Sequence, residues 1–183
     1  MTNLSQNLLQ KTKFSLSFDR IANTVFYCTK VAVPGIMLGT ATQPTPFVNL
    51  KVPGTKVQYE PLTVTFLVDA EMNAWYNIFN WMMGIGRPVS AAQYRELANN
   101  APPLGSGGPP STGIRPPYSD AQLSIYTAKN NQEIKFAFLD CFPVNLGPVE
   151  MDTEVSADAI LTVSASFVYS YYTFTNIDNN LTA

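Results

Sequence analysis

The sequence predicts a mainly β fold: a two-sheet β-sandwich or small barrel with one flanking α-helix. Three observations support this prediction. Several stretches alternate apolar and polar residues with the period of two that is typical of strands. Fourteen prolines and ten glycines punctuate the chain and act as turn formers between these stretches. A single segment has the apolar spacing of a long amphipathic helix. At this length, residues 1–183 are expected to form one domain.

Two strands are predicted at the start of the chain. Phe14–Asp19 alternates phenylalanine and leucine with serine and aspartate, so one face of this strand is apolar. Asn23–Val31 is the second predicted strand, and it places Val25, Tyr27 and Thr29 on one face.

The segment Pro34–Tyr59 is different in composition. It contains four prolines and three glycines among short β-prone pieces. Because proline is tolerated mainly at sheet edges and in turns, this composition predicts a long arm or extended hairpin. Lys51 and Lys56 outnumber the nearby acid Glu60, so the arm has a net positive charge.

A strand and two helices are predicted next. Leu62–Val68 alternates cleanly, and Asp69 is placed to cap a helix over Ala70–Gly84, with Glu71 favourable in its first turn. Ser90 is predicted to cap a second, short helix that reaches Leu97. The apolar face of the longer helix should hold Met72, Trp75, Phe79 and Met82, and such a face is more typical of packing on a sheet than of a cofactor site.

The region after the helices returns to β structure. Residues 99–118 hold six prolines and four glycines, which predicts a flexible surface loop. Strands are predicted at Leu123–Thr127 and Ile134–Asp140, joined by a turn at residues 129–131. Pro143–Ser156 is expected to connect them to the last strand.

The last predicted strand, Ala159–Phe174, has the strongest pattern in the chain. At about 3.3 Å per residue it would be about 50 Å long, well beyond the usual strand of about five to ten residues. One face holds Ala159, Leu161, Val163, Ala165, Phe167, Tyr169 and Tyr171. The opposite face holds Thr162, Ser164, Ser166 and Ser170. A long strand with an uncharged polar face suits a sheet that continues beyond one subunit, so the pattern favours assembly over chemistry.

Charge is sparse and unevenly distributed. Charged residues make up 13% of the chain, against about 25% in an average soluble domain, which favours a surface partly covered by other copies. Residues 1–60 carry a balance of +4, residues 61–135 are neutral, and residues 136–183 contain six acids and no base. Opposite charge at the two ends suits head-to-tail contacts, not a nucleic-acid-binding surface.

Residue types that usually carry catalysis are missing. The chain has no histidine, which excludes Ser-His-Asp and Cys-His catalysis and histidine-ligated zinc. Cys28 and Cys141 lack metal-ligand spacing and are expected to be buried free thiols. Glu150, Asp152 and Glu154 alternate, but a solvated acidic loop is a better interpretation than a cation site or glycosidase pair. We therefore expect no enzyme, cofactor or metal site.

The order of elements resembles that of a known family. The segments FYC (26–28) and AVPG (32–35) precede the arm, the strand and the helix containing Trp75–Met83, and FLDCFPVNLG (138–147) precedes the last strand. This order, which covers nearly the whole chain, resembles the major tail tube protein of contractile-tailed bacteriophages. Its most specific part is the Phe-Pro-Val-Asn-Leu-Gly segment, and the order of the elements carries the resemblance.

The resemblance implies a structural virion protein, assembled in the host cytoplasm, that forms hexameric rings stacked into a tube. A contractile sheath and a baseplate would be its partners, and DNA would pass through the channel without specific binding. A channel wall should be polar without gripping phosphate. The candidate channel-lining residues are Thr63, Thr65, Thr162, Ser164, Ser166 and Ser170. The candidate inter-ring contacts are Phe47, Asn49, Lys51 and Lys56 of the arm. Because the last third lacks bases, we expect a neutral to acidic lumen.

Two alternatives remain open at this stage. A tube-initiating baseplate protein, or the secreted tube protein of a type VI-like or other injection system, would have a similar sequence. A monomeric carbohydrate-binding β-sandwich would use Trp75, Trp81 and the tyrosines, although both tryptophans lie on the predicted helix.

Overall fold

The computed structural model of the chain describes residues 12–21, 28–99, 117–126, 132–152, 154, 160–176 and 181–182. These residues form two β-sheets, a separate two-stranded ribbon and two helices, which confirms the predicted mainly β fold. The strands are β1 (Phe14–Phe18), β2 (Cys28–Ala32), β3 (Ile36–Pro44), β4 (Asn49–Tyr59), β5 (Leu62–Leu67), β6 (Ser119–Tyr126), β7 (Gln132–Leu146), β8 (Thr162–Val168), β9 (Tyr171–Asn176) and β10 (Leu181–Thr182). The helices are α1 (Asn73–Gly86) and α2 (Ala91–Asn99).

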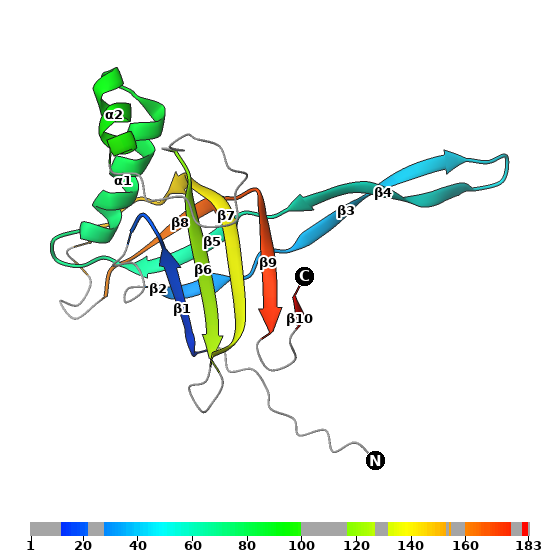
Figure 1. The fold of residues 1–183 in the computed structure, drawn as a ribbon, viewed down its shortest axis with the longest axis horizontal. Coiled ribbons are helices and arrows are strands. Elements are labelled where there is room, and N and C mark those ends of the chain that lie inside the picture. The colour runs from blue at the N-terminus through cyan, green and yellow to red at the C-terminus, as the bar shows by residue number, and fades with distance from the viewer. Residues whose placement is uncertain are drawn as a thin grey trace, which may run out of the picture.

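The two sheets share strand β7. Sheet A has the order β1–β6–β7–β9–β10, sheet B has the order β7–β8–β5–β2, and all the pairs are antiparallel. The strands of sheet B run across those of sheet A in a second layer, and α1 and α2 lie together at one end of the sheets (Figure 1). The ribbon β3–β4 extends away from both layers (Figure 1).

The predicted long final strand is wrong, because a corner divides it into β8 and β9. β8 pairs with the second half of β7 in sheet B, and β9 pairs with the first half in sheet A. At the corner, Asp140 has φ 55°, a left-handed conformation that aspartate tolerates better than most residues. The N–H of Ser170 donates to the carbonyl of Leu139 at 3.0 Å, so β7 and the segment that joins β8 to β9 stay hydrogen-bonded through the bend.

The corner also changes which residues face the core. The predicted buried face is confirmed for Val163, Ala165, Phe167 and Tyr169. Tyr171 is 43% exposed, and Tyr172 packs on the buried rings instead, because the bend at Ser170 interrupts the two-residue alternation. Ala159 lies outside the described residues.

Other strand boundaries differ from the prediction for local reasons. β7 continues through Pro143, where a connector was expected, because the register shifts between Pro143 and Asn145 and this bulge accommodates the proline. β6 begins at Ser119, earlier than Leu123. Of the predicted strand Asn23–Val31, residues 23–27 are outside the described part of the chain, as are the turn at 129–131 and most of the loop at 99–118.

The longer helix starts later than predicted and buries a neighbouring face. Met72 occupies the N-cap position with φ 54° and no side-chain cap, so the predicted Asp69 cap is wrong. The Asp69 carboxylate instead accepts a hydrogen bond from the Asn73 amide at 3.0 Å, and Glu71 precedes the helix. The buried residues of α1 are Ala74, Ile78, Trp81 and Gly84, and the predicted set Met72, Trp75, Phe79 and Met82 is only half-buried.

Tertiary contacts select this face. The Trp81 indole N–H donates to the Pro117 carbonyl at 2.9 Å, and Gly84 lets α2 approach closely, because a Cβ there would lie 2.9 Å from Leu97 Cβ. The predicted second helix is confirmed as α2. The Gln93 side-chain oxygen accepts from the N–H of Ser90 at 3.4 Å, which is half of a capping box.

The core lies between the two sheets and under α1. Phe167 of sheet B lies 4.5 Å from the ring of Phe18 in sheet A and 6.2 Å from Trp81 of α1, so it joins all three layers. Cys141 is buried and Cys28 is half-buried, and both are free thiols, as predicted. Burial raises the pKa of Cys28 to about 11 and raises that of Cys141 further, so neither thiol is a ready nucleophile at neutral pH.

Candidate functional site: the outer sheet face and the arm

The outer face of sheet B brings together five of the six hydroxyl residues predicted to line a channel. Thr63 lies opposite Ser166, and Thr65 lies opposite Ser164 across the β5–β8 pair. Thr162 extends the same face. Thr63, Thr162 and Ser164 are exposed, while the residues that alternate with them are buried. Sheet B therefore presents small hydroxyl side chains on one side and the core on the other.

Ser170, the sixth predicted residue, is not part of this face. It lies at the corner beyond β8, where its hydroxyl is 3.3 Å from a carboxylate oxygen of Asp140. The N–H of Asp140 in turn donates to the Asp120 carboxylate at 3.1 Å. These contacts give Ser170 a structural role in holding the bend between the two sheets.

Sequence reasoning missed the residues that the edge strand β2 brings to this face. Ala32 lies opposite Thr63, and Lys30 lies opposite Thr65 on the edge strand β2. The register of β2 shifts between Cys28 and Lys30, so the alternation of this short strand could not be extrapolated from its sequence. Lys30 is exposed, and it brings a positive charge to a face that was expected to be neutral or acidic.

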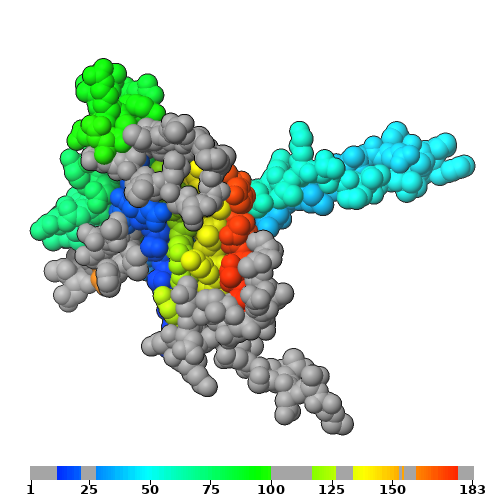
Figure 2. All heavy atoms as spheres, viewed as in Figure 1, coloured from blue at the N-terminus to red at the C-terminus, as the bar shows by residue number. Residues whose placement is uncertain are grey.

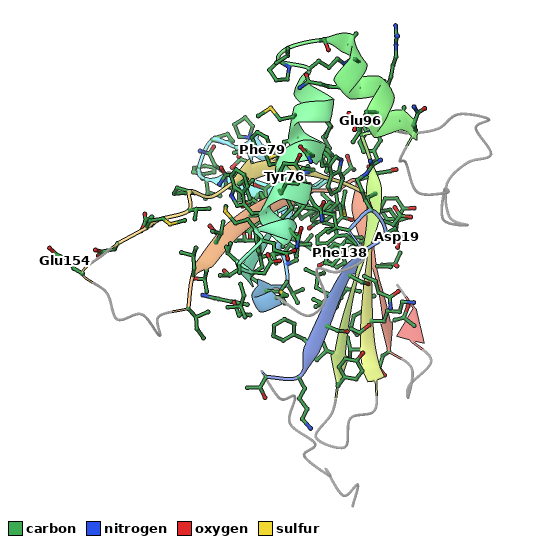
Figure 3. The ribbon with its side chains drawn as sticks, turned by 90° about the vertical axis from the view of Figure 1, so that its left-hand side faces the viewer. Asp19, Tyr76, Phe79, Glu96, Phe138 and Glu154 are labelled. Carbon is green, nitrogen blue, oxygen red and sulfur yellow. The ribbon has the colours of Figure 1, made fainter. Side chains whose placement is uncertain are left out.

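Three of the acids of the last third lie in the segment after β7 and not on this face. Glu150, Asp152 and Glu154 are exposed in the segment that follows β7, as predicted for a solvated acidic loop. Figure 3 shows Glu154 projecting away from the sheets and helices. The N–H of Glu154 donates to the Asp152 carboxylate at 2.8 Å, a local turn contact.

Sheet A has a second small polar face. The cross-strand register places Ser15, Ser124, Lys135 and Thr175 in one row across β1, β6, β7 and β9. Ser124 is buried and its hydroxyl accepts a hydrogen bond from the Gln122 amide at 3.2 Å, so this face is less open than that of sheet B. The sequence pattern had singled out only the face of sheet B.

The four predicted inter-ring residues lie on the ribbon β3–β4 or its tip. We call residues 34–59 the arm, and Figure 2 shows it projecting from the body of the molecule. Phe47 at the tip is 97% exposed, Asn49 pairs with Pro44, and the Lys51 ammonium donates to the Thr42 hydroxyl at 2.9 Å. The arm also exposes large apolar side chains along its length: Ile36, Met37, Leu38, Val48, Leu50, Val52 and Val57. Such a surface is typical of a contact with another chain.

A cluster of tyrosines holds the base of the arm to the sheets. The hydroxyl of Tyr169 donates to the Glu60 carbonyl at 2.9 Å, and that of Tyr172 donates to the Pro34 carbonyl at 3.5 Å. Tyr59 packs its ring within 6 Å of both. Burial and, to a smaller extent, the proximity of Tyr172 raise the pKa of Tyr169, so its hydroxyl stays protonated and can donate the hydrogen bond. These contacts hold both ends of the arm where it leaves the body of the molecule.

The described residues do not assemble a catalytic or metal-binding set. No group of three or more Cys, Asp or Glu side chains among them could hold a metal ion. A cavity of about 390 Å³ lies between α1, α2 and Arg20, but its described lining has no serine or cysteine beside a carboxylate. Trp81 is 2% exposed and offers no open ring face to a sugar, and Trp75 is half-buried with one ring face stacked on Phe79, 5.2 Å between the ring centroids. Neither described helix is both long and apolar enough to cross a membrane.

Comparisons with known proteins agree with this geometry. The chain matches the phage tail tube protein family over residues 3–175. It is 26% identical to the tail tube terminator protein of Enterobacteria phage T4, over 91% of this chain and 88% of that protein. The fold resembles a chain of the anti-feeding prophage baseplate, with a TM-score of 0.62, 11% identity, and coverage of 95% of this chain and 99% of the other. It also resembles a chain in the sheath/tube terminator structure of the extracellular contractile injection system PVC, with a TM-score of 0.60, 12% identity, and coverage of 93% and 99%.

Two packed sheets, a projecting arm and a hydroxyl-rich outer face define a tube-type structural protein. This chain belongs to the phage tail tube protein family, and it is a tail-tube-related component of a phage or similar particle.

Proposed function

We propose that the chain forms a closed hexameric ring of a contractile tail's inner tube, through which DNA leaves the particle. The carrying observation is the outer face of sheet B, whose small hydroxyl residues suit a channel wall in a protein of this family. β2 is an edge strand of that sheet in the described chain, and closing a ring would cover such an edge. A sheath and a baseplate are its proposed partners, and its role is structural rather than enzymatic.

We further propose that this ring ends the tube instead of forming its body. The supporting observation is the similarity to a tube terminator over 91% of this chain. The second candidate is the major tube protein, because the order of elements along nearly the whole chain resembles that of the major tail tube protein. A tube initiator is a third position within the same class.

Immunogold labelling of particles separates these positions. A terminator gives label at one end of each tail, and a major tube protein gives label along the tube of sheath-stripped tails. Negative-stain microscopy of the purified protein gives a second readout, because a terminator forms single rings and a tube protein forms long tubes. A protein that remains monomeric in both size-exclusion chromatography and microscopy would contradict the whole proposal.

The arm is proposed to contact a neighbouring ring. Its exposed apolar residues and its lysines at positions 51 and 56 support this role. Deleting Gln43–Pro53 removes the outer part of the ribbon without touching the core, so the variant should fold normally and form rings that no longer join a neighbouring ring. Normal ring-to-ring association by this variant would rule the idea out.

A finer pair of variants tests the tip alone. Phe47→Ser and Val89→Ser each remove an apolar side chain that is at least 85% exposed, so neither should change stability much. Only the change at the tip should weaken association of the ring with the ends of sheath-stripped tails, measured by co-sedimentation. Equal behaviour of the two variants would argue against a contact at Phe47.

A further inference from the structure

One cross-strand row on the outer face of sheet B combines a cation with two hydroxyl groups. Lys30 of β2 lies opposite Thr65 of β5, which lies opposite Ser164 of β8. Directly opposed residues of antiparallel strands have Cβ atoms about 4.5–5.5 Å apart, so the three side chains are neighbours on one face. Lys30 and Ser164 are exposed and Thr65 is half-buried.

The backbone around Lys30 holds this row in place. The Thr29 hydroxyl donates to the Thr65 carbonyl at 3.2 Å, and the Cys28 thiol lies 3.7 Å from the Lys30 carbonyl. These contacts span the point where the register of β2 shifts, and they fix the alternation that turns Lys30 outward with Thr65. The lysine therefore belongs to the sheet face and not to a loose edge.

Among the residues that the structure describes, Lys30 has no acidic cross-strand neighbour on this face. Its own cross-strand row continues with Thr65 and Ser164. The neighbouring row on this face holds Ala32, Thr63, Ser166 and Asn145, and none of these residues is charged. The Lys30 side chain is exposed, so its charge is available to an anion from outside the chain.

We propose that the row Lys30–Thr65–Ser164 binds backbone phosphates of double-stranded DNA. Lysine provides a point charge on a flexible stem, and hydroxyl groups donate to phosphate oxygens without reading the base sequence. The proposal rests on the proposed function, because a closed ring would bring one such row from each copy to the same level of the channel. It replaces the expected acidic lumen with a ring of weak cationic contacts.

Such contacts suit a channel that guides DNA but lets it pass. A lysine–phosphate contact is electrostatic, sequence-independent and weakened by salt, so each contact is easily exchanged for the next phosphate. The row would centre the duplex by symmetric attraction, whereas an acidic wall would centre it by repulsion. The two mechanisms predict opposite signs for the effect of removing the charge.

Binding of a random-sequence 30-base-pair duplex across a salt series tests the proposal. Rings are first verified by microscopy, so a failure of ring formation is recorded separately from a failure to bind DNA. Wild-type rings should bind at low salt, with log affinity falling linearly with log salt. Lys30→Gln should weaken binding by about tenfold or more and make the salt dependence shallower, by about 0.9 in slope for each phosphate that the lysine no longer neutralises. Lys30→Arg should retain binding.

Arg95→Gln is the matched control, because it removes one exposed positive charge from α2 and should leave DNA binding unchanged. Acetylation footprinting gives a second readout that works for rings and monomers alike: DNA should protect Lys30 and leave Lys51 and Lys56 reactive. Wild-type protein that does not bind the duplex, or equal binding by Lys30→Gln and wild type, would overturn the proposal. Protection of Lys135 in place of Lys30 would also overturn it and would assign the DNA contact to sheet A.

Discussion

Replacing Phe167 with alanine tests the assignment of the two faces of sheet B. Phe167 is 1% exposed, and its ring contacts Phe18 of sheet A and Trp81 of α1. The truncation therefore opens a cavity where both sheets and the helix meet. Deleting a buried phenylalanine side chain costs about 3–5 kcal/mol, because transfer energy is lost and the surrounding layers cannot collapse fully.

The neighbouring residue provides the matched control. Ser166 precedes Phe167 on β8 and points to the opposite, hydroxyl-bearing face, so Ser166→Leu adds volume outside the core. In a domain of this size 1 kcal/mol corresponds to about 2–4 °C in Tm. Phe167→Ala should therefore lower Tm by about 6–20 °C, and Ser166→Leu should change it by less than about 2 °C.

The Tm of each variant is measured by thermal unfolding, monitored by circular dichroism and by differential scanning calorimetry. All measurements use the same protein concentration, because assembly adds stability. Equal Tm values for the two variants would refute the assignment of faces. A large loss for Ser166→Leu alone would show that the hydroxyl face is the packed one.

Three further predictions concern the arm and the thiols. Gly54→Ala places a Cβ 2.6 Å from the Gly39 carbonyl oxygen across the ribbon, so amide hydrogen exchange in β3 and β4 should accelerate while the Tm of the core stays unchanged. Gly86→Ala is the control, because a Cβ at Gly86 has no atom within 4 Å. Unchanged amide exchange in both variants would contradict the close approach of Gly54 and Gly39. Tyr169→Phe removes the hydroxyl that donates to the Glu60 carbonyl and should lower the free energy of unfolding by about 1 kcal/mol. Tyr172→Phe should lower it by less, because the hydrogen bond of Tyr172 to the Pro34 carbonyl is longer. Chemical denaturation that ranks the two variants in the reverse order would contradict the role of these hydrogen bonds at the base of the arm. Burial raises the pKa of Cys28 to about 11 in the folded chain against an ordinary value of 9.0, so its ionisation favours unfolding and stability should fall as pH rises from about 9 to 11. The loss should be smaller in Cys28→Ala than in the wild type, but not absent, because the pKa of Cys141 is also raised; an equal loss in that variant would assign the effect to other groups.

Local sequence patterns determined most of the fold. Alternation identified β1, β5 and β8, because one-sided burial forces a period of two on any strand. Proline and glycine content identified the segment 34–59 as an extended element, since neither residue supports a packed core there. The hydroxyl face of sheet B followed from the same alternation, and the structure brings Thr63, Thr65, Ser164 and Ser166 together on it.

Tertiary structure alone decided the features that depend on partners distant in the sequence. The corner at Asp140 and Ser170 divides an unbroken sequence alternation, because β7 passes from one sheet to the other and the paired segment β8–β9 must bend with it. The buried face of α1 was set by the contacts of Trp81 and Gly84 with Pro117 and Leu97, which no helical spacing could reveal. Lys30 joined the hydroxyl face through a register shift in β2, because strand pairing and not the neighbouring residues determines which way an edge side chain points.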